Sequence, residues 1–238
     1  MASAQPAPAS PRTAVVWDGL ERSLRSGGPK EVVDIGGGTG GSAVRLAAMG
    51  HRVSVVDPSP DALAALSRRA GDAGVSVVGH QGDVDQLADI VGPGGTDVVL
   101  CHGVLEVVEP TAALASIRRV LRPGGVLSLL VAQTHAAVIA RAMAGQFQQA
   151  RAILEEPPGA VGPRERRRFR RAELDELLTA AGFEVEAVHG VRVFTDLVPG
   201  ALVDQESGGA AALVELERTV ATREEYLPLA AQLHILAR

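Results

Sequence analysis

The fold of this chain is decided by the stretch Glu31-Val-Val-Asp-Ile-Gly-Gly-Gly-Thr-Gly-Gly41. Its first half contains the β-branched residues Val32, Val33 and Ile35, which suit a buried parallel strand. The glycines that follow let the backbone turn sharply and come close to a ligand. The apolar spacing after them predicts a helix up to Gly50, so the loop opens onto a helix N-terminus. A strand, a glycine loop and a helix in this order predict an α/β fold with a nucleotide-type site.

Acidic residues accompany three successive predicted strands. Asp34 lies in the first strand, and Asp57 and Asp83 follow the next two. From residue 34 to residue 40 an acidic residue is followed by three glycines at alternate positions, which differs from the Gly-x-Gly-x-x-Gly pattern of dinucleotide-binding enzymes. A carboxylate at Asp57 can accept hydrogen bonds from both ribose hydroxyls of an adenosine. The pattern favours a cofactor with a single adenosine over a dinucleotide such as NAD.

Composition indicates one globular domain. The chain has 238 residues, of which 46% are hydrophobic, enough for the core of a single α/β domain. We expect residues 1–11, mostly Ala, Pro and Ser, to be a disordered tail before a single domain at 12–238. The only cysteine is Cys101, and no apolar run is long enough for a membrane span or a signal peptide. We expect a cytoplasmic protein with no membrane partner and no metal site.

The rest of the chain alternates predicted strands and helices. An insertion at about 134–170 is expected to be helical over residues 136–154 and to lie over the mouth of the site. A second insertion, at about 190–231, separates the last two strands. We expect Trp17 to anchor the core and Cys101 to be an inert apolar residue. Further strands are predicted at 52–56, 75–80, 96–101, 126–131, 183–188 and 233–236, and helices at 12–24, 61–73, 171–181 and near 210–221.

Arginines are concentrated in one short segment, although the net charge of the chain is −5. The overall charge argues against a bulk polyanion binder. The segment is either the solvated start of a helix or a patch that contacts phosphates, and the sequence leaves both interpretations open. This arginine cluster consists of Arg164, Arg166, Arg167, Arg168, Arg170 and Arg171.

The motif at residues 34–40 resembles motif I of the class I S-adenosylmethionine-dependent methyltransferases. The resemblance implies a Rossmann-like fold with a seven-stranded, mostly parallel sheet, helices on both faces and a helical insertion over the active site. It implies S-adenosyl-L-methionine as the cofactor and S-adenosyl-L-homocysteine as the product. Carried over position by position, it assigns cofactor binding to Asp34, Gly36, Gly37, Gly38, Gly40, Asp57, Pro58, Asp83, Val84, His102 and Gly103.

Further motifs occur along most of the chain, namely Val104-Leu-Glu106, Leu121-Arg-Pro-Gly-Gly-Val-Leu-Ser-Leu129, Met143-Ala-Gly145 with Phe147, Gly190-Val-Arg-Val-Phe194 and Leu213-Val-Glu-Leu-Glu217. With them the chain from residue 12 to residue 238 is similar to the bacterial tRNA methyltransferases that esterify 5-carboxymethoxyuridine at the wobble position. This narrower resemblance implies tRNA as a partner, contacted through the arginine cluster. It also implies that Arg12, Gln133, His135 and Arg192 lie on or near the acceptor side.

The implied reaction requires the methyl donor and the acceptor to be positioned, and it requires no catalytic side chain. A sulfonium methyl is already activated and an acceptor carboxylate is ionised at pH 7, so an orienting arginine, Arg12 or Arg192, suffices. Were the acceptor a phenol, hydroxyl or amine, a base such as His102 or His135 would be useful; otherwise His102 packs or hydrogen-bonds near the cofactor.

Two alternatives to a tRNA enzyme stay open. One is a small-molecule O- or N-methyltransferase, and the other is a cofactor-binding protein without activity. Recognition of a nucleobase usually uses aromatic stacking, whereas only 3% of this chain is aromatic. The sequence does not predict an oligomeric state.

Overall fold

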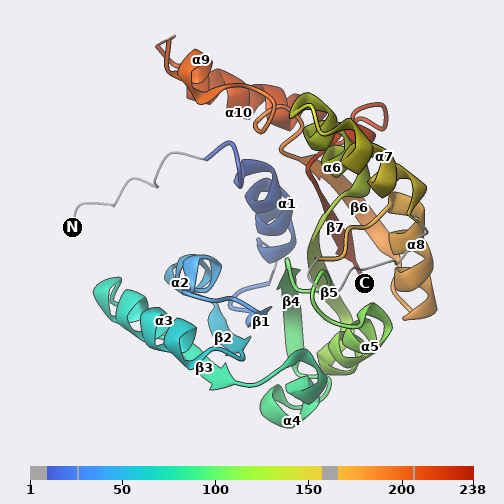
Figure 1. Cartoon of the computed structure of the whole chain (residues 1–238). Coiled ribbons are helices and arrows are strands. Elements are labelled where there is room, and N and C mark those ends of the chain that lie inside the picture. Colours follow the sequence, from blue (N-terminus) through green and yellow to red (C-terminus); the bar gives the residue numbers. More distant parts are fainter. Residues whose placement is uncertain (1–9, 26, 157–165, 206) are drawn as a thin grey trace.

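The computed structural model describes residues 10–25, 27–156, 166–205 and 207–238. Within them lies one seven-stranded sheet with the order β3-β2-β1-β4-β5-β7-β6 (Figure 1). Neighbouring strands from β3 to β5 are parallel, and β7 runs antiparallel to both β5 and β6. The predicted Rossmann-like, mostly parallel sheet is confirmed. The strands are β1 Glu31–Ile35, β2 Arg52–Asp57, β3 Val78–Gln81, β4 Thr96–His102, β5 Leu121–Ala132, β6 Val185–Val191 and β7 Gln232–Ala237.

Helices cover both faces of the sheet (Figure 1). One face carries α1 (Ala14–Leu24), α2 (Gly41–Ala48) and α3 (Pro60–Asp72), and the other carries α4 (Leu87–Val91), α5 (Pro110–Val120) and α8 (Arg171–Ala180). The strands supply both layers because successive side chains point to opposite faces. In β4, Val98 and Leu100 join the core under α1, α2 and α3, whereas Val99 and Cys101 join the core under α4, α5 and α8. Continuous apolar runs in the sequence are thus explained by burial on both sides.

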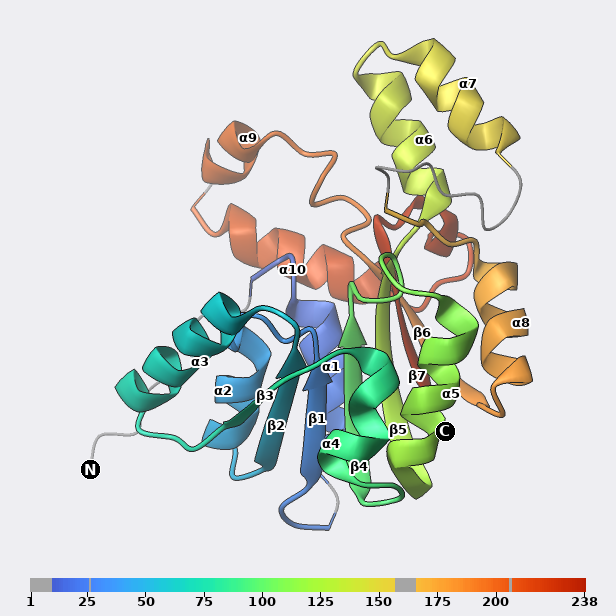
Figure 2. The ribbon, with the colours of Figure 1, turned by 60° about the horizontal axis from the view of Figure 1, so that its bottom comes forward.

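Two further helical units stand at the edge where the parallel strands end (Figure 2). Helix α6 begins directly after β5 and forms a hairpin with α7, and α9 and α10 lie between β6 and β7 in the sequence. They correspond to the two predicted insertions. No helix in the described ranges combines the length and the apolar character that a membrane crossing requires. The helices of the two insertions are α6 Thr134–Met143, α7 Phe147–Glu155, α9 Gly200–Gln205 and α10 Gly209–Val220. Short 3-10 turns occur at Val84–Gln86 and Leu227–Leu229.

Several predicted bounds were wrong for local reasons. Residues 136–154 form two helices and not one, because Gly145 adopts φ 73 between them. Strand β3 starts at Val78 because the N–H of Val75 still bonds to the carbonyl of Ala70 at the end of α3. Strand β6 starts at Val185 for the same reason, since the N–H of Phe183 bonds to the end of α8. The predicted tail falls on residues 1–11, of which only Ser10 and Pro11 are described.

Candidate active site

The loop between β1 and α2 forms the centre of the site. Gly36, Gly38 and Gly40 have positive φ, so the chain turns there without a side chain. Gly37 is restricted for a different reason, because a Cβ on it would lie 2.6 Å from the Oδ2 atom of Asp34. The N–H of Gly36 bonds to the carbonyl of Val56 at 2.8 Å, which holds the loop against β2. The loop therefore leads into the N-terminus of α2, where the first backbone N–H groups of a helix have no partner within the helix, as a nucleotide site requires.

Asp57, at the end of β2, holds the loop from the other side. Its Oδ2 atom accepts a hydrogen bond of 2.9 Å from the N–H of Gly38, and its Oδ1 atom accepts one of 2.8 Å from the N–H of Ser59. Each carboxylate oxygen has two lone pairs, so both keep an acceptor position for a ligand hydroxyl. The arrangement fits the two hydroxyls of a ribose.

Asp34 is a buried carboxylate with an uncommon environment. It is 3% exposed, and desolvation, followed by the charge of Asp57, raises its pKa to about 7. No hydrogen bond to its carboxylate occurs within the described ranges. A cationic group next to Asp34 would stabilise the charged form, because an opposite charge at close range offsets the desolvation. S-adenosylmethionine carries an ammonium and a sulfonium group, so the residues present fit this cofactor.

The predicted adenine end of the site lies beside β3. Asp83 is exposed and starts the 3-10 turn, where its Oδ1 atom accepts a hydrogen bond of 2.7 Å from the N–H of Val84. Val84 is buried, and the carbonyl of Pro58 accepts a hydrogen bond of 3.4 Å from the amide of Gln81. Asp57, Pro58 and Asp83 thus share the carboxyl edge of β2 and β3, and their contacts with adenosine remain a prediction.

His102 ends β4 on the floor of the site. Its Nε2 atom lies 2.9 Å from the hydroxyl of Ser128, which lies 2.9 Å from the Nε2 atom of His234. Burial lowers the pKa of His102 to about 4, so the imidazole is neutral at pH 7. The N–H of Gly103 bonds to the carbonyl of Leu130, which fixes the turn after β4. A neutral, hydrogen-bonded imidazole agrees with packing near the cofactor. The thiol of Cys101 is buried and its pKa is raised by desolvation, as an inert residue requires.

Arg12 and Arg192, far apart in the sequence, meet at Asp196. The Nε atom of Arg192 donates to Asp196 Oδ2 at 3.0 Å, and a second guanidinium nitrogen of Arg192 contacts the same oxygen. Arg12 Nη1 lies 3.5 Å from Asp196 Oδ1. Both arginines line a cavity of about 200 Å³ that also contains His102 and Trp17. Two of the predicted acceptor residues are therefore brought together next to a predicted cofactor residue.

A second, more apolar cavity adjoins the first at Arg192. It has a volume of about 340 Å³, and Arg192 and Asp196 supply its charged lining. One wall is α6, so the first insertion contributes directly to the space beside the arginines. The apolar residues of α6 that line it include Ala136, Ile139, Ala140 and Met143.

Gln133 and His135 line neither cavity. The Gln133 side chain is buried, and its amide nitrogen donates to the carbonyls of Leu227 at 2.9 Å and Ala230 at 2.6 Å. It ties the end of β5 to the segment before β7. His135 Nδ1 lies 3.4 Å from the remaining Gln133 oxygen. An acceptor contact through these two residues remains a prediction, with less geometric support than one through Arg12 and Arg192.

The described part of the arginine cluster runs beside the end of β5. Phe169 anchors it, because this ring is fully buried and its N–H bonds to the carbonyl of Ala132 at 2.9 Å. Downstream, Arg170 donates to the carbonyl of Glu156 and Arg171 pairs with a carboxylate one turn along α8. Arg166 is exposed, Arg167 and Arg168 are half-buried, and Arg164 lies outside the described residues.

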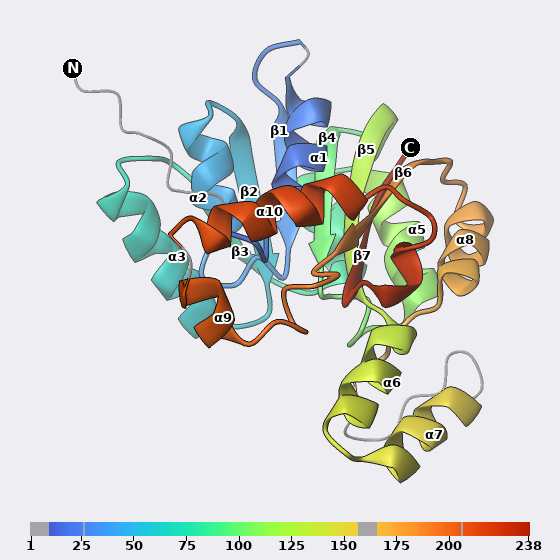
Figure 3. The same ribbon diagram turned by 90° about the horizontal axis from the view of Figure 1, so that it is seen from above.

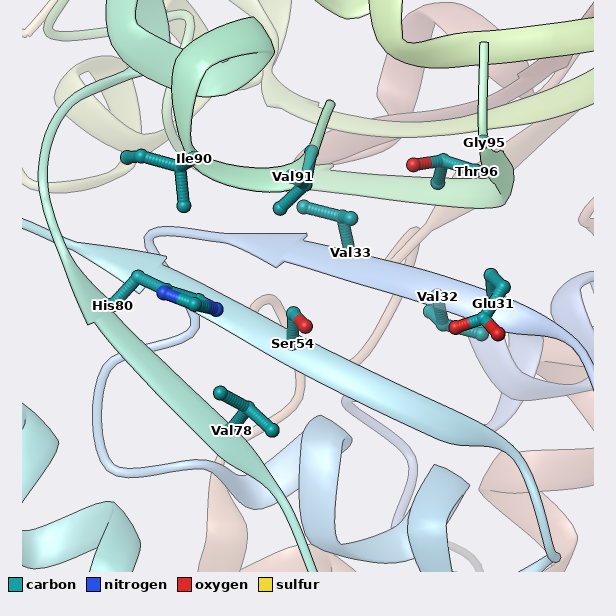
Figure 4. Close-up of a pocket in the computed structure, with 10 residues that line it drawn as sticks. All are labelled: Glu31, Val32, Val33, Ser54, Val78, His80, Ile90, Val91, Gly95 and Thr96. Carbon is teal, nitrogen blue, oxygen red and sulfur yellow. The ribbon is translucent and has the colours of Figure 1, made fainter. Parts of the chain in front are cut away.

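A separate cavity of about 470 Å³ lies on the α4 side of the sheet, among side chains of β1, β2, β3 and α4 (Figure 4). Its lining includes Glu31 and Thr96, the first residues of β1 and β4. Nucleotides bind at the carboxyl ends of parallel strands, and this cavity extends toward the amino ends. It is therefore distinct from the site at the glycine loop.

Comparison with known proteins identifies the family of this chain. A family model described as a methyltransferase domain matches residues 32–125. The tRNA 5-carboxymethoxyuridine methyltransferase of Escherichia coli (strain K12) is 32% identical over 234 residues, covering 95% of this chain and 87% of the relative. The chain belongs to the class I S-adenosylmethionine-dependent methyltransferases. This methyltransferase uses S-adenosylmethionine as its methyl donor, as its motif I predicts.

Other relatives share parts of the methyltransferase or only its fold. A ubiquinone biosynthesis O-methyltransferase of Xanthomonas euvesicatoria pv. vesicatoria is 31% identical over 161 residues, which are 67% of this chain and 65% of the relative. The structure of the Burkholderia thailandensis 1,6-didemethyltoxoflavin-N1-methyltransferase, which contains S-adenosylhomocysteine, aligns with a TM-score of 0.56 and 24% identity. That alignment covers 96% of this chain and 76% of the other. At this identity it supports the fold alone.

Some residues of the site had no signal in the sequence. Asp196 lies in a loop with no recognisable motif, and its role depends on Arg12, which is 184 positions away in the sequence. Ser128 sits in an apolar strand and becomes relevant only through His102 and His234. Trp17 packs against the core, as predicted, and also lines the smaller cavity, with the Arg45 guanidinium 3.9 Å from its ring centroid.

Proposed function

We propose that this methyltransferase esterifies a carboxylate on tRNA, at a wobble nucleoside of the 5-carboxymethoxyuridine type. The observation that carries the proposal is the meeting of Arg12 and Arg192 at one carboxylate, Asp196, beside the site of the methyl donor. Two guanidinium groups against one carboxylate leave one positive charge. A monoanionic acceptor suits that balance, and the name of the Escherichia coli relative supports the choice of acceptor.

The residues of this chain have a positioning role in the proposed reaction. Bound S-adenosylmethionine supplies a methyl group that its sulfonium activates. An acceptor carboxylate oxygen forms the new O–CH3 bond as the S–CH3 bond breaks, which gives a methyl ester and a neutral thioether. Asp196 holds the guanidinium of Arg192, which orients the acceptor carboxylate through its remaining N–H groups. Alignment of this kind supplies much of the acceleration in a displacement between bound groups.

No side chain has to act as a base for such an acceptor. A carboxylate with an ordinary pKa near 4 is ionised at pH 7, so no proton leaves during the transfer. His102 is neutral at that pH and already engaged with Ser128. Its proposed role is to shape the floor of the cofactor site.

The arginine cluster is the proposed phosphate contact. The stretch 166–171 contains five arginines and no acidic residue, and it lies at the carboxyl edge of β5, from which α6 also starts. Contacts to phosphates give affinity and orientation, while base contacts give specificity. The cluster would hold the RNA while the cavity beside Arg192 receives the acceptor.

The deciding experiment follows a labelled methyl group into tRNA. Purified enzyme is incubated with methyl-labelled S-adenosylmethionine and with tRNA that carries the free carboxylate, and nucleosides are analysed by mass spectrometry. We expect label on the wobble nucleoside, and mild alkali should release it because esters hydrolyse. Label that resists alkali, or transfer only to small acceptors and never to tRNA, would overturn the proposal and favour a small-molecule O- or N-methyltransferase.

A further inference from the structure

Glu217 is a fully buried carboxylate in α10, within the long insertion before β7. Its two oxygens accept four hydrogen bonds from three consecutive residues of another segment. Oε2 accepts from the N–H of Val193 at 2.9 Å. Oε1 accepts from the N–H of Phe194 at 2.9 Å, the N–H of Thr195 at 2.8 Å and the hydroxyl of Thr195 at 2.7 Å. Successive N–H groups that converge on one anion form a tight, geometrically defined nest.

The segment held by Glu217 lies between the two residues that define the charged pocket. Arg192 precedes the three N–H groups and Asp196 follows them. Arg192 is also the only non-glycine residue of the described ranges with positive φ, at 60°. Such a conformation persists only when the surroundings fix it. The Glu217 nest on one side and the ion pair with Asp196 on the other supply that restraint.

The next residue of α10 contacts α1, the helix that supplies part of the lining of the smaller cavity. Arg218 Nε donates to Asp18 Oδ2 at 2.6 Å, and Arg218 Nη2 donates to Asp18 Oδ1 at 3.2 Å. Asp18 belongs to α1, whose neighbouring residue Trp17 lines the same cavity as Arg12 and Arg192. Figure 3 shows α10 lying across α1. One helix therefore contacts both chain segments that bring the arginines together.

We propose that Glu217 is a positioning residue for methyl transfer, which acts by fixing the backbone of residues 193–195 and thereby the guanidinium of Arg192. This inference rests on the proposed function of the pocket. It gives the insertion that contains α10 a role in acceptor alignment. The groups facing Glu217 are all donors, so an acceptor-only side chain satisfies them and an amide, which brings its own N–H groups, does not.

The test compares Glu217→Gln with Glu224→Gln, a change of the same kind at an exposed residue just after α10. We expect Glu217→Gln to lower kcat on the acceptor at least tenfold and to leave the Kd for S-adenosylmethionine within twofold of the wild type. Glu224→Gln should match the wild type in both. If Glu217→Gln does not fold, Thr195→Val removes only the hydroxyl contact and should lower kcat by a smaller factor.

A double-mutant cycle separates positioning from general weakening of the fold. If Glu217 acts through Arg192, then Glu217→Gln should cost little in an Arg192→Lys background, because the aligned fork is already lost. If the loss of kcat in the double variant equals the product of the losses in the two single variants, the proposal is overturned.

Hydrogen exchange gives a readout that needs no acceptor. The amides of residues 193–195 should exchange at least tenfold faster in Glu217→Gln than in Glu224→Gln, because their common acceptor is changed. Unchanged exchange would overturn the inference. Failure of the wild type to methylate any tRNA would overturn the proposed function instead, and exchange would still decide whether Glu217 holds this segment.

Discussion

The Asp57 carboxylate and the backbone N–H of Gly38 are joined by a hydrogen bond of 2.9 Å, so the end of β2 holds the loop that follows β1. Asp57→Ala removes this bond and the acceptor for the ribose hydroxyls. Charge-assisted hydrogen bonds contribute about 1.5–3 kcal/mol, so affinity for S-adenosylmethionine should fall about tenfold to a hundredfold. Titration calorimetry of the wild type and Asp57→Ala with S-adenosylmethionine measures this loss of affinity. A wild-type protein that gave no heat with S-adenosylmethionine but bound NAD would contradict the assignment of this loop.

Asp34 predicts a pH dependence of cofactor binding. Burial, followed by the charge of Asp57, raises the pKa of Asp34 from 3.8 to about 7, so the free protein holds this proton at lower pH. A bound cation favours the charged form, and binding must then release the proton. Affinity for S-adenosylmethionine should fall by up to about tenfold per pH unit below 7.

Asp34→Asn cannot release a proton, so its weaker binding should be nearly independent of pH between 5.5 and 7.5. Calorimetry in buffers of different ionisation enthalpy counts the released protons. The same raised pKa has a consequence for stability in the absence of cofactor. Because the folded state binds the proton more tightly, stability from this group is present below about pH 4 and is lost as pH rises toward 7. An equal pH dependence in wild type and Asp34→Asn would show that another group titrates.

Gly37 offers a steric test of the Asp34 site. A Cβ at Gly37 would lie 2.6 Å from Asp34 Oδ2 and 3.0 Å from Val55 Cγ1, so the carboxylate has to move in Gly37→Ala. Cofactor affinity should fall at least tenfold, since a shift of about 1 Å in a binding group is costly. Gly41→Ala is the matched control, because the nearest atom to its Cβ is the end of Arg69 at 3.7 Å. Equal affinity in the two variants would mean that Asp34 does not contact the cofactor.

The parts of this molecule that could be predicted are those in which one local pattern determines one structure. Strand β1, its glycine loop and Asp57 follow from β-branched spacing, positive φ and a strand-end carboxylate. The role of Glu217 has no such pattern, because a glutamate in an amphipathic helix usually faces solvent. It became buried only because the loop after β6 presents three N–H groups to it. Long-range convergence of this kind is what the sequence alone leaves open.

The arginine cluster predicts a change in the salt dependence of RNA binding. Replacing Arg166, Arg167 and Arg168 by Gln should weaken tRNA binding and lower the slope of log K against log salt by about 0.7–0.9 for each lost phosphate contact. Cofactor affinity should be unchanged. The matched control replaces Arg25, Arg52 and Arg68, which are exposed and lie outside the cluster. If both triple variants have the same slope, the cluster is a solvated helix start without a phosphate role.

A carboxylate acceptor oriented by Arg192 predicts a rate of methyl transfer that is insensitive to pH. An acceptor carboxylate stays ionised across neutral pH, and the pKa of His102 is lowered to about 4, so neither group titrates between pH 6 and 8. At saturating cofactor, kcat should be nearly flat over that range. Arg192→Lys keeps the charge but loses the planar fork that contacts Asp196, and kcat should fall on the order of a hundredfold. Single-turnover methyl transfer, measured between pH 6 and 8 in the wild type, Arg192→Lys and His102→Asn, gives the pH profile of each protein. His102→Asn should change cofactor affinity more than the shape of the profile, because the imidazole contacts Ser128 and its lowered pKa makes it a weak base. A rate that rises tenfold per pH unit and loses that slope in a histidine variant would require a general base. That outcome would assign the enzyme a hydroxyl, phenol or amine acceptor.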